Sequence, residues 1–337
     1  MQYSVGYQLR DDAKFVERIA ACREQVREVY FAWADFPNGR NRQTQKLGMT
    51  PWEAQQRQEQ ELTWLAGQGI QMNLLFNATC YGKDSQSRAF FRKVGETVDY
   101  IGEHMGLASI TTTSPLIGKF INENFPELEV RASVNMGIGT IAGMEYVGAY
   151  FDSFYIQREF NRDFDRIREL KSWCDGNGKK LYALANGGCL NHCSAHTFHD
   201  NLVSHEAEIS EMDNGYQFLG VCADYLQKEG NARALLEQTS FIRPEDIPLY
   251  EDLFPVMKLA TRVNSHPERI LKAYIQDGTY SGSILDLLEP NHTALFYPWL
   301  LENRKISSEV KDGKLVYGNF EEAFLKLDAL LLGGKTC

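Results

Sequence analysis

Short apolar runs alternate with longer amphipathic segments along most of this 337-residue sequence. Each run holds about four to eight residues, and several are apolar at consecutive positions, as in a parallel sheet buried on both faces. We predict strands at Tyr3–Gln8, Val29–Trp33, Gln71–Asn77, Ser109–Thr113, Glu129–Val134, Ser153–Gln157, Lys180–Ala185 and Val256–Thr261. Eight strands alternating with helices favour an α/β fold of the (β/α)8 TIM-like barrel type over an open doubly wound sheet.

Several helix starts support this alternation. Thr50-Pro51-Trp52-Glu53 combines an N-cap, a proline at the first helical position and a glutamate that completes a capping box. Ser265-His266-Pro267-Glu268 has a similar arrangement, and Arg243-Pro244-Glu245-Asp246 predicts another helix start. The apolar spacing also predicts helices over residues 15–29 and 164–174.

One barrel of about 250 residues with insertions accounts for the chain length, so we predict a single domain over residues 1–337. Residues 186–254 are too long for a simple connection between the seventh and eighth strands. They are predicted to form a cysteine-containing insertion at the barrel mouth, where barrel enzymes build their active sites. A second excursion, residues 34–50, contains Asp35 and Arg40, and its composition is equally typical of a solvated loop.

The net charge and the hydropathy of the sequence argue against two classes of protein, those that bind nucleic acids and those that cross a membrane. The 35 Lys and Arg against 45 Asp and Glu give a net charge of −10, which argues against a nucleic-acid partner because phosphate binding needs a positive field. No apolar stretch approaches about 18 residues, and the opening MQYSVGYQLR lacks the pattern of a secretory signal. We therefore expect a cytoplasmic protein without a membrane partner, in which neighbouring cysteines serve metal binding or catalysis.

The main candidates for functional residues are cysteines, several of which follow predicted strands. The strand Lys180–Ala185 runs into Asn186-Gly187-Gly188-Cys189-Leu190-Asn191-His192-Cys193, in which two thiols stand in a CxxxC spacing. Cys80 follows the third strand, and Cys222 lies in the insertion. Four thiolates meeting at one barrel face match the ligand set of a [4Fe–4S] cluster.

Other interpretations of these thiols remain open. A structural zinc usually draws on two close pairs of ligands, and only one close pair exists here; buried thiols without a ligand role are a further alternative. An S-adenosylmethionine cofactor is unsupported, because the third slot of a CxxxCxxC motif is occupied by His196. With Cys80 outside the ligand set, a three-thiolate cluster with one open iron would remain. Cys22 and Cys174 fall in helical patterns and are assigned to packing, and Cys337 ends the chain.

The segment 186–193, followed by His199 and Asn201, resembles the cluster-binding stretch of the collagenase-like peptidase family, the U-32 group. The resemblance covers residues 70 to 285 and includes Leu74–Gly82, Glu159-Phe160-Asn161-Arg162, Phe241–Asp246, Tyr250 and Met257–Arg262. It implies a TIM-like barrel. Several members are iron–sulfur proteins, among them paired proteins for oxygen-independent hydroxylation in ubiquinone biosynthesis and relatives that hydroxylate RNA.

The resemblance implies that Cys80, Cys189, Cys193 and Cys222 hold a [4Fe–4S] cluster. The sequence departs from the family at His196, where a relative often has arginine, and this removes an anion-binding residue at that position. Three histidines lie beside the thiols, and we interpret them as hydrogen-bond partners of the sulfurs. These are His192, His196 and His199.

Polar residues at other strand ends predict substrate contacts. Asn77 ends the third strand, and Lys258 and Arg262 lie on or just past the eighth; a lysine or arginine there can bind a carboxylate or phosphate. The alternative for Lys258, and the favoured interpretation for Arg158, is an ion pair across the barrel.

We therefore expect an iron–sulfur oxidoreductase that modifies a small anionic or aromatic substrate, as in oxygen-independent hydroxylation, with Lys258, Arg262 and Asn77 orienting the substrate. The alternatives are a cluster-bearing scaffold subunit with a homo- or heterodimeric partner, a U-32-type peptidase, and a zinc-stabilised barrel. No GxSxG elbow or HExxH motif signals a serine hydrolase or a zincin.

Overall fold

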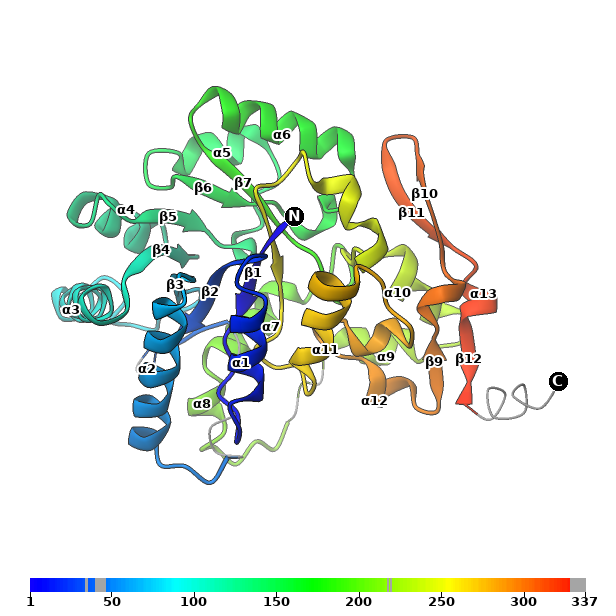
Figure 1. Cartoon of the computed structure of the whole chain (residues 1–337), viewed down its shortest axis with the longest axis horizontal. Coiled ribbons are helices and arrows are strands. Elements are labelled where there is room, and N and C mark those ends of the chain that lie inside the picture. Colours follow the sequence, from blue (N-terminus) through cyan, green and yellow to red (C-terminus); the bar gives the residue numbers. More distant parts are fainter. Residues whose placement is uncertain (34–35, 40–46, 217, 219, 328–337) are drawn as a thin grey trace.

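The computed structural model describes residues 1–33, 36–39, 47–216, 218 and 220–327. Asp35, Arg40 and Cys337 lie outside these residues. Eight parallel strands form a closed barrel in chain order, and β8 pairs with β1 to complete it (Figure 1). The strands are β1 (Gln2–Gly6), β2 (Val26–Ala32), β3 (Gln71–Phe76), β4 (Leu107–Thr112), β5 (Glu129–Ala132), β6 (Ser153–Tyr155), β7 (Lys180–Leu184) and β8 (Val256–Leu259). The predicted (β/α)8 barrel is confirmed.

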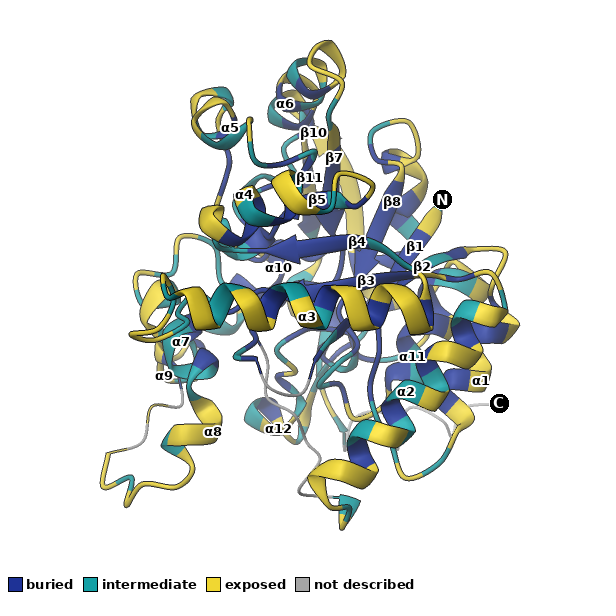
Figure 2. Cartoon of the chain, turned by 90° about the vertical axis from the view of Figure 1, so that its left-hand side faces the viewer, coloured by how far each residue is buried: buried dark blue, intermediate teal, exposed yellow. Residues whose placement is uncertain are grey.

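Helices surround the barrel strands. Those before β7 are α1 (Lys14–Ala21), α2 (Pro51–Gly67), α3 (Arg88–Met105), α4 (Pro115–Asn124), α5 (Ile141–Val147) and α6 (Phe164–Gly176). Figure 2 shows buried strands inside and helices such as α3 with an exposed outer face. This is the layer order of a (β/α)8 barrel, in which helices cover the outside of the sheet.

The insertion between β7 and β8 carries α7 (His196–Ser204), α8 (Glu206–Ile209), α9 (Val221–Leu226) and α10 (Ala234–Glu237). After β8 the chain forms α11 (Pro267–Leu271), α12 (Thr293–Phe296), β9 (Trp299–Leu301), β10 (Ser307–Lys311), β11 (Lys314–Gly318), α13 (Phe320–Ala323) and β12 (Phe324–Lys326). The strands β10 and β11 pair antiparallel, as do β9 and β12. The end of the insertion returns to the barrel, where the Ile242 backbone N–H donates to Ala185 over 2.8 Å.

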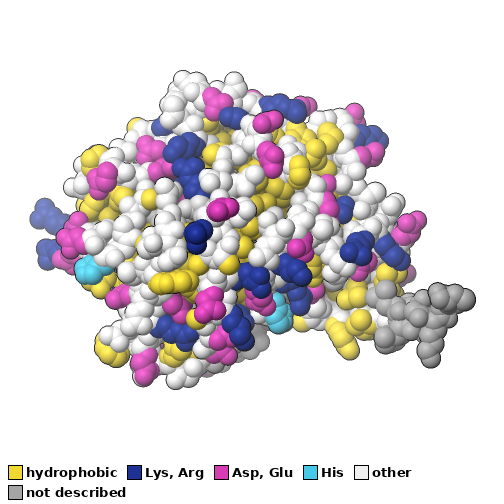
Figure 3. All heavy atoms as spheres, in the orientation of Figure 1, with side chains coloured by type: hydrophobic (Ala, Val, Ile, Leu, Met, Phe, Trp, Pro, Cys, Tyr) yellow, Lys and Arg dark blue, Asp and Glu magenta, His cyan; other side chains and the backbone are white. Residues whose placement is uncertain are grey.

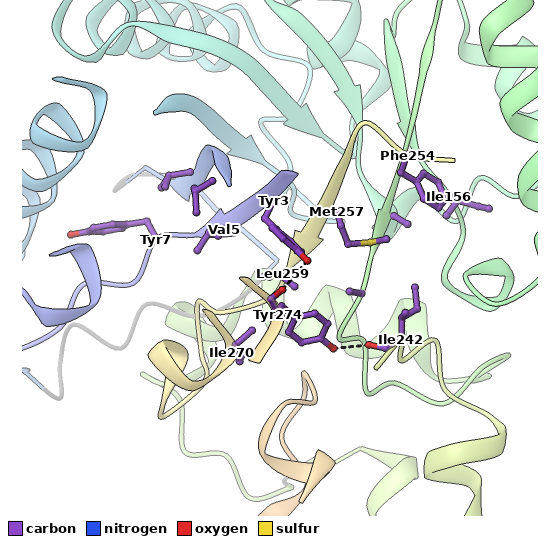
Figure 4. Packing of buried hydrophobic residues seen from close by; sticks show 14 of the residues in the cluster. Tyr3, Val5, Tyr7, Ile156, Ile242, Phe254, Met257, Leu259, Ile270 and Tyr274 are labelled. Carbon is purple, nitrogen blue, oxygen red and sulfur yellow. Dashed lines mark hydrogen bonds between the residues drawn. The ribbon is translucent and has the colours of Figure 1, made fainter. Parts of the chain in front are cut away.

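The hydrophobic core joins the first and last barrel strands to this returning segment. Figure 4 shows Tyr3 of β1 and Met257 of β8 beside Tyr274. The Tyr3 hydroxyl donates to the Tyr274 carbonyl over 2.9 Å, and the Tyr274 hydroxyl donates to the Ile242 carbonyl over 2.6 Å. Buried tyrosines here pack as apolar bodies while each hydroxyl is satisfied by a backbone oxygen.

One predicted helix is wrong. The apolar spacing over residues 15–29 predicts a helix, but α1 ends at Ala21 and β2 begins at Val26. Val26 is buried and pairs with Tyr3 of β1. The second half of the apolar pattern therefore belongs to a strand, because closing the barrel buries those residues on both sides.

The predicted helix starts have mixed outcomes. The Thr50 capping box is confirmed: Thr50 Oγ1 accepts from the Glu53 backbone N–H over 3.2 Å, and Glu53 accepts in return over 2.8 Å. Helix α11 begins at Pro267, but its N-cap is His266 without a capping side chain, so the Ser265 cap is wrong. The segment Pro244–Tyr250 is a 3-10 helix, since Pro248 inside it cannot donate to a preceding carbonyl.

The described residues contain no helix that is both long and apolar enough to cross a membrane. On the face drawn in Figure 3, Lys and Arg side chains are interspersed with Asp and Glu. This pattern is typical of a solvated surface.

Candidate functional site

A pocket opens at the carboxyl ends of the barrel strands. We call it the mouth pocket, and five polar residues from four strand ends line it: Asn77 after β3, Asn135 after β5, Arg158 after β6, Lys258 on β8 and Arg262 beyond β8. Tyr30 of β2 and Glu289 also line it. Three basic side chains, of Lys258, Arg158 and Arg262, therefore face one cavity, at the end of the barrel where such enzymes bind substrates.

Lys258 and Arg158 are the buried members of this group, each with 7% of its surface exposed. Lys258 Nζ lies 4.0 Å from the centre of the Tyr30 ring and 4.8 Å from that of Tyr155. In the described part of the chain, Lys258 Nζ forms neither a hydrogen bond nor an ion pair, so the alternative of an ion pair across the barrel is wrong. Burial, reinforced by the Arg262 charge, holds the pKa of Lys258 well below its ordinary value.

Arg158 is held by Asn135 and His196. Its Nη2 donates to Asn135 Oδ1 over 2.6 Å, and its Nη1 lies 2.6 Å from His196 Nε2. The favoured prediction, an ion pair with a carboxylate, is therefore wrong. Two of the five guanidinium N–H groups are used in these contacts, and the remaining donors are available to a ligand in the pocket.

Asn77 and Arg262 occupy the mouth as predicted. Asn77 Oδ1 accepts from the Gly39 backbone N–H over 3.1 Å, and Arg262 Nη1 donates to Asn38 Oδ1 over 3.2 Å. Both contacts tie residues 38–39 to the rim of the pocket. The predicted roles of Asn77, Lys258 and Arg262 in orienting a substrate stay predictions.

A buried ion pair joins two strands of the barrel. Arg131 of β5 makes two contacts with Glu28 of β2, at 2.7 Å and 3.2 Å, and Ser4 donates to Glu28 over 2.6 Å. Ser4 lies opposite both Glu28 and Lys258 in the strand register. Glu28, which stands across Ser4 from Lys258 in the sheet, is thus occupied by Arg131. Sequence reasoning missed this pair, although charges at alternate positions in Glu129-Val130-Arg131-Ala132 were a signal for inward-facing side chains.

The start of the CxxxC loop is fixed to its neighbours by Asn186. This fully buried side chain donates to the carbonyls of Ala260 and Leu287, both over 2.9 Å, and accepts from the Ala260 N–H over 2.7 Å. A Cβ on Gly187 would lie 2.2 Å from Ser240 Oγ, and one on Gly188 would lie 2.8 Å from the Pro290 carbonyl. The two glycines are therefore required for close packing beside β7 and β8.

Two of the predicted ligand thiols are neighbours. Burial is the larger cause that raises the pKa of Cys222, and the charge of Cys193 raises it further. The Cys193 carbonyl accepts from the His196 N–H over 3.1 Å, which puts Cys193 at the amino end of α7. Cys189, Cys193 and Cys222 are all partly exposed.

Cys80 lies near the other end of α7. The neighbouring Thr79 N–H donates to Ser204 Oγ over 3.0 Å, and the Cys80 thiol is hydrogen-bonded to His205. At a rise of about 1.5 Å per residue, this helix separates its two ends by roughly 12 Å. Cys80 and Cys193 are therefore held at opposite ends of one helix.

His205 connects Cys80 to a carboxylate. Its Nδ1 lies 3.0 Å from Glu208 Oε2. The hydrogen bond from His205 is the main cause that lowers the pKa of Cys80, and the same bond raises the pKa of His205. Sequence reasoning did not single out His205, since the contact joins residues 125 positions apart.

The other histidines and cysteines have definite positions. The His192 backbone N–H donates to Glu159 over 3.1 Å, His196 contacts Arg158, and His199 packs against the Phe218 ring at 5.5 Å. Cys22 and Cys174 are buried, which confirms their assignment to packing. Among the described residues, no group of three or more His, Cys, Asp or Glu side chains is arranged to hold a metal ion. The four-thiolate cluster stays a prediction.

Comparison with known proteins adds the family context. No family model matches the chain. An uncharacterized protease from Methanocaldococcus jannaschii, MJ1657, is 29% identical over 163 residues, which are 46% of this chain and 45% of that protein. The match thus spans about half the length of this curated relative. Among solved structures, the U32 peptidase Mk0906 superposes with a TM-score of 0.53 at 15% identity, covering 77% of this chain and 93% of its own.

These similarities support a relationship to the U32 peptidase family. The resemblance predicted from the motifs is confirmed at this level, and the shared barrel is confirmed by the structural match. Membership of the iron–sulfur branch stays a prediction.

Proposed function

We propose that this chain is an enzyme that acts on a small anionic substrate at the carboxyl mouth of its barrel. One observation carries the proposal: Lys258, Arg158 and Arg262 line one pocket, and the guanidinium of Arg158 forms no ion pair among the described residues. Buried cations are normally paired. A carboxylate or phosphate on the substrate would supply the missing negative charge, and Asn77 and Asn135 would add hydrogen bonds.

Calorimetry with oxalate and with inorganic phosphate tests anion binding. We expect saturable binding that weakens about 10- to 100-fold in Arg158→Met, because a hydrogen bond to a charged group contributes roughly 1.5–3 kcal/mol. The exposed Arg23→Met is the matched control and should bind as the wild type does. An affinity that is the same in Arg158→Met and the wild type would overturn the proposal. Turnover by the isolated chain separates an enzyme from a scaffold subunit of a larger complex.

A [4Fe–4S] cluster on Cys80, Cys189, Cys193 and Cys222 is the second element of the proposal, and it would make the enzyme an oxidoreductase. The donor chemistry fits, because thiolates are the ligands of such clusters. The arrangement fits only in part: Cys193 and Cys222 are neighbours, whereas Cys80 is engaged by His205 at the far end of α7. We therefore derive no reaction step through a cluster.

Anaerobic reconstitution with iron and sulfide tests the cluster. A broad visible absorption that bleaches with dithionite, together with a matching paramagnetic resonance signal, would support it. Loss in Cys193→Ala with an intact signal in Cys80→Ala would support three-thiolate ligation. Colourless protein that retains one stoichiometric zinc would favour the zinc-stabilised barrel instead.

Peptidase activity is a separate candidate, suggested by the names of the two similar proteins. The observation that favours it is the chain of contacts from Cys80 to His205 and on to Glu208, since a thiol beside an oriented histidine is an activated nucleophile. Cleavage of a fluorogenic peptide library that is lost in both Cys80→Ser and His205→Ala would support it. Cleavage that persists in Cys80→Ser would exclude this thiol as the nucleophile.

A further inference from the structure

Lys258 differs from an ordinary anion-binding lysine in its environment. Its side chain projects from β8 into the barrel and is enclosed by the rings of Tyr30 and Tyr155. The Tyr30 hydroxyl is itself occupied, because it donates to the Leu259 carbonyl over 2.8 Å. The charge of Glu28 favours an ammonium here, but Glu28 is held by Arg131 and Ser4; Glu289 also lines the pocket.

This environment favours the neutral amine. Burial removes the water that stabilises an ammonium, and the charges of Arg262, Arg131 and Arg158 oppose a further positive charge. The faces of the two tyrosine rings attract a cation, but the net result is a pKa well below the ordinary value. A neutral lysine amine is a nucleophile toward carbonyl carbon, and desolvation beside another cationic group is a recognised way to activate one.

The pocket also offers an anchor for an acid group next to this amine. Arg158 retains N–H donors after its contacts with Asn135 and His196, and Arg262 adds positive charge. A small ligand whose carboxylate is bound at Arg158 therefore presents its neighbouring carbon atoms to the Lys258 side of the same cavity.

We propose that Lys258 forms a reversible imine with the carbonyl carbon of a small oxo acid whose carboxylate is held by Arg158. The inference rests on the proposed function and names its substrate class. The amine nitrogen forms a bond to the carbonyl carbon, and the carbonyl oxygen leaves as water with the two amine hydrogens. No oxidant or reductant is consumed. The protonated imine withdraws electrons from the adjacent carbon, so the reaction class is carbon–carbon bond cleavage or proton exchange beside the former carbonyl.

Reductive trapping tests the imine. The full chain is incubated near pH 7.5 with glyoxylate or pyruvate and sodium cyanoborohydride, and adducts are located by peptide mass spectrometry. We expect one adduct per chain, at Lys258, formed at least about tenfold faster than at any exposed lysine, since each unit of lowered pKa raises the free-amine fraction about tenfold. The exposed Lys311→Met is the matched control and should be labelled at Lys258 as the wild type is.

Two further comparisons show whether the carboxylate and Lys258 act as proposed. An uncharged aldehyde, propanal, should label Lys258 at least about tenfold more slowly than glyoxylate, because it lacks the group held by Arg158. Mapping of the wild type needs no variant, so misfolding of Lys258→Met or Lys258→Arg cannot obscure the result. Saturable binding of pyruvate without an adduct at Lys258 overturns the imine and leaves the proposed function standing. Absence of both pyruvate and oxalate binding overturns both proposals.

Discussion

Arg158 Nη1 lies 2.6 Å from His196 Nε2, and this contact joins the mouth pocket to the helix that follows the CxxxC loop. A guanidinium can only donate, so His196 Nε2 is the acceptor in this contact, and the same nitrogen lies 3.3 Å from Asp200 Oδ2. Asn135 Oδ1 accepts from the other terminal nitrogen. Asn135 and His196 thus orient the arginine, which has no carboxylate within ion-pair distance among the described residues.

His196→Ala should therefore weaken anion binding in the mouth pocket without abolishing it. We expect the Kd for oxalate to rise about 5- to 20-fold, because Arg158 keeps Asn135 as a partner but loses half of its orientation. Calorimetry measures the change, and His104→Ala on α3 is the matched control, since that side chain is exposed. An unchanged Kd in His196→Ala would show that the contact does not position Arg158.

Lys258→Met should leave the protein as stable as the wild type near pH 7, or more stable by on the order of 1 kcal/mol. The reason is the lowered pKa of Lys258 in the folded protein. In the unfolded chain the lysine is protonated at every pH below its ordinary pKa of 10.5, whereas in the folded chain it takes up the proton only at a lower pH. In that window the wild type loses stability as the pH falls. Methionine fills the same space without this penalty.

Urea unfolding at pH 7 and at pH 10 measures the effect. The advantage of Lys258→Met should be larger at pH 7 and should shrink toward pH 10, where the unfolded lysine also begins to lose its proton. The exposed Lys311→Met should show no such pH-dependent difference. An advantage that grows toward pH 10 would mean that the buried amine is charged in the folded protein.

The parts of the site that the sequence could predict are those set by strand periodicity. Asn77 and Lys258 lie at or next to strand ends, and parallel strands in a barrel bring those ends to one rim, so their placement follows from local pattern alone. The partners of these residues do not follow. Arg131 and Glu28 are 103 positions apart, and Arg158 and His196 come from different loops, so their pairing depends on packing that no local pattern encodes.

Breaking the Glu28–Arg131 pair should strongly destabilise the folded protein. Glu28→Gln leaves a buried guanidinium with less compensation, and we expect a loss of roughly 3–5 kcal/mol in the free energy of unfolding. The pair also predicts acid sensitivity. Burial raises the pKa of Glu28, but the Arg131 charge and hydrogen bonds outweigh it, so the net pKa is lowered.

A carboxylate whose pKa is lowered in the folded protein stabilises the fold at pH values above 4.5, which is its ordinary pKa. This stabilisation is lost as the pH falls through the pKa of the folded state. Urea unfolding at pH 7 and pH 4 should therefore show a steeper loss in the wild type than in a Glu28→Leu, Arg131→Met double variant. Equal slopes in the two proteins would show that the pair does not govern acid stability. The double variant should also recover part of the stability lost in Glu28→Gln, because it removes both buried charges.

Thiol reactivity offers a test that separates the roles proposed for Cys80. Cys80 and Cys222 are both partly exposed, but the pKa of Cys80 is lowered by His205, whereas the pKa of Cys222 is raised by burial and by Cys193. The thiolate is the reactive form. Near pH 7, iodoacetamide should therefore alkylate Cys80 at least about tenfold faster than Cys222, and His205→Ala should remove most of that difference. Peptide mass spectrometry over time follows both sites in one sample.

The same measurement on anaerobically reconstituted protein tests whether Cys80 is a cluster ligand, because ligation would protect Cys80 from alkylation together with Cys193. If Cys193 is protected while Cys80 still reacts rapidly, Cys80 is a free nucleophile beside His205, and a cluster on this chain has at most three thiolates.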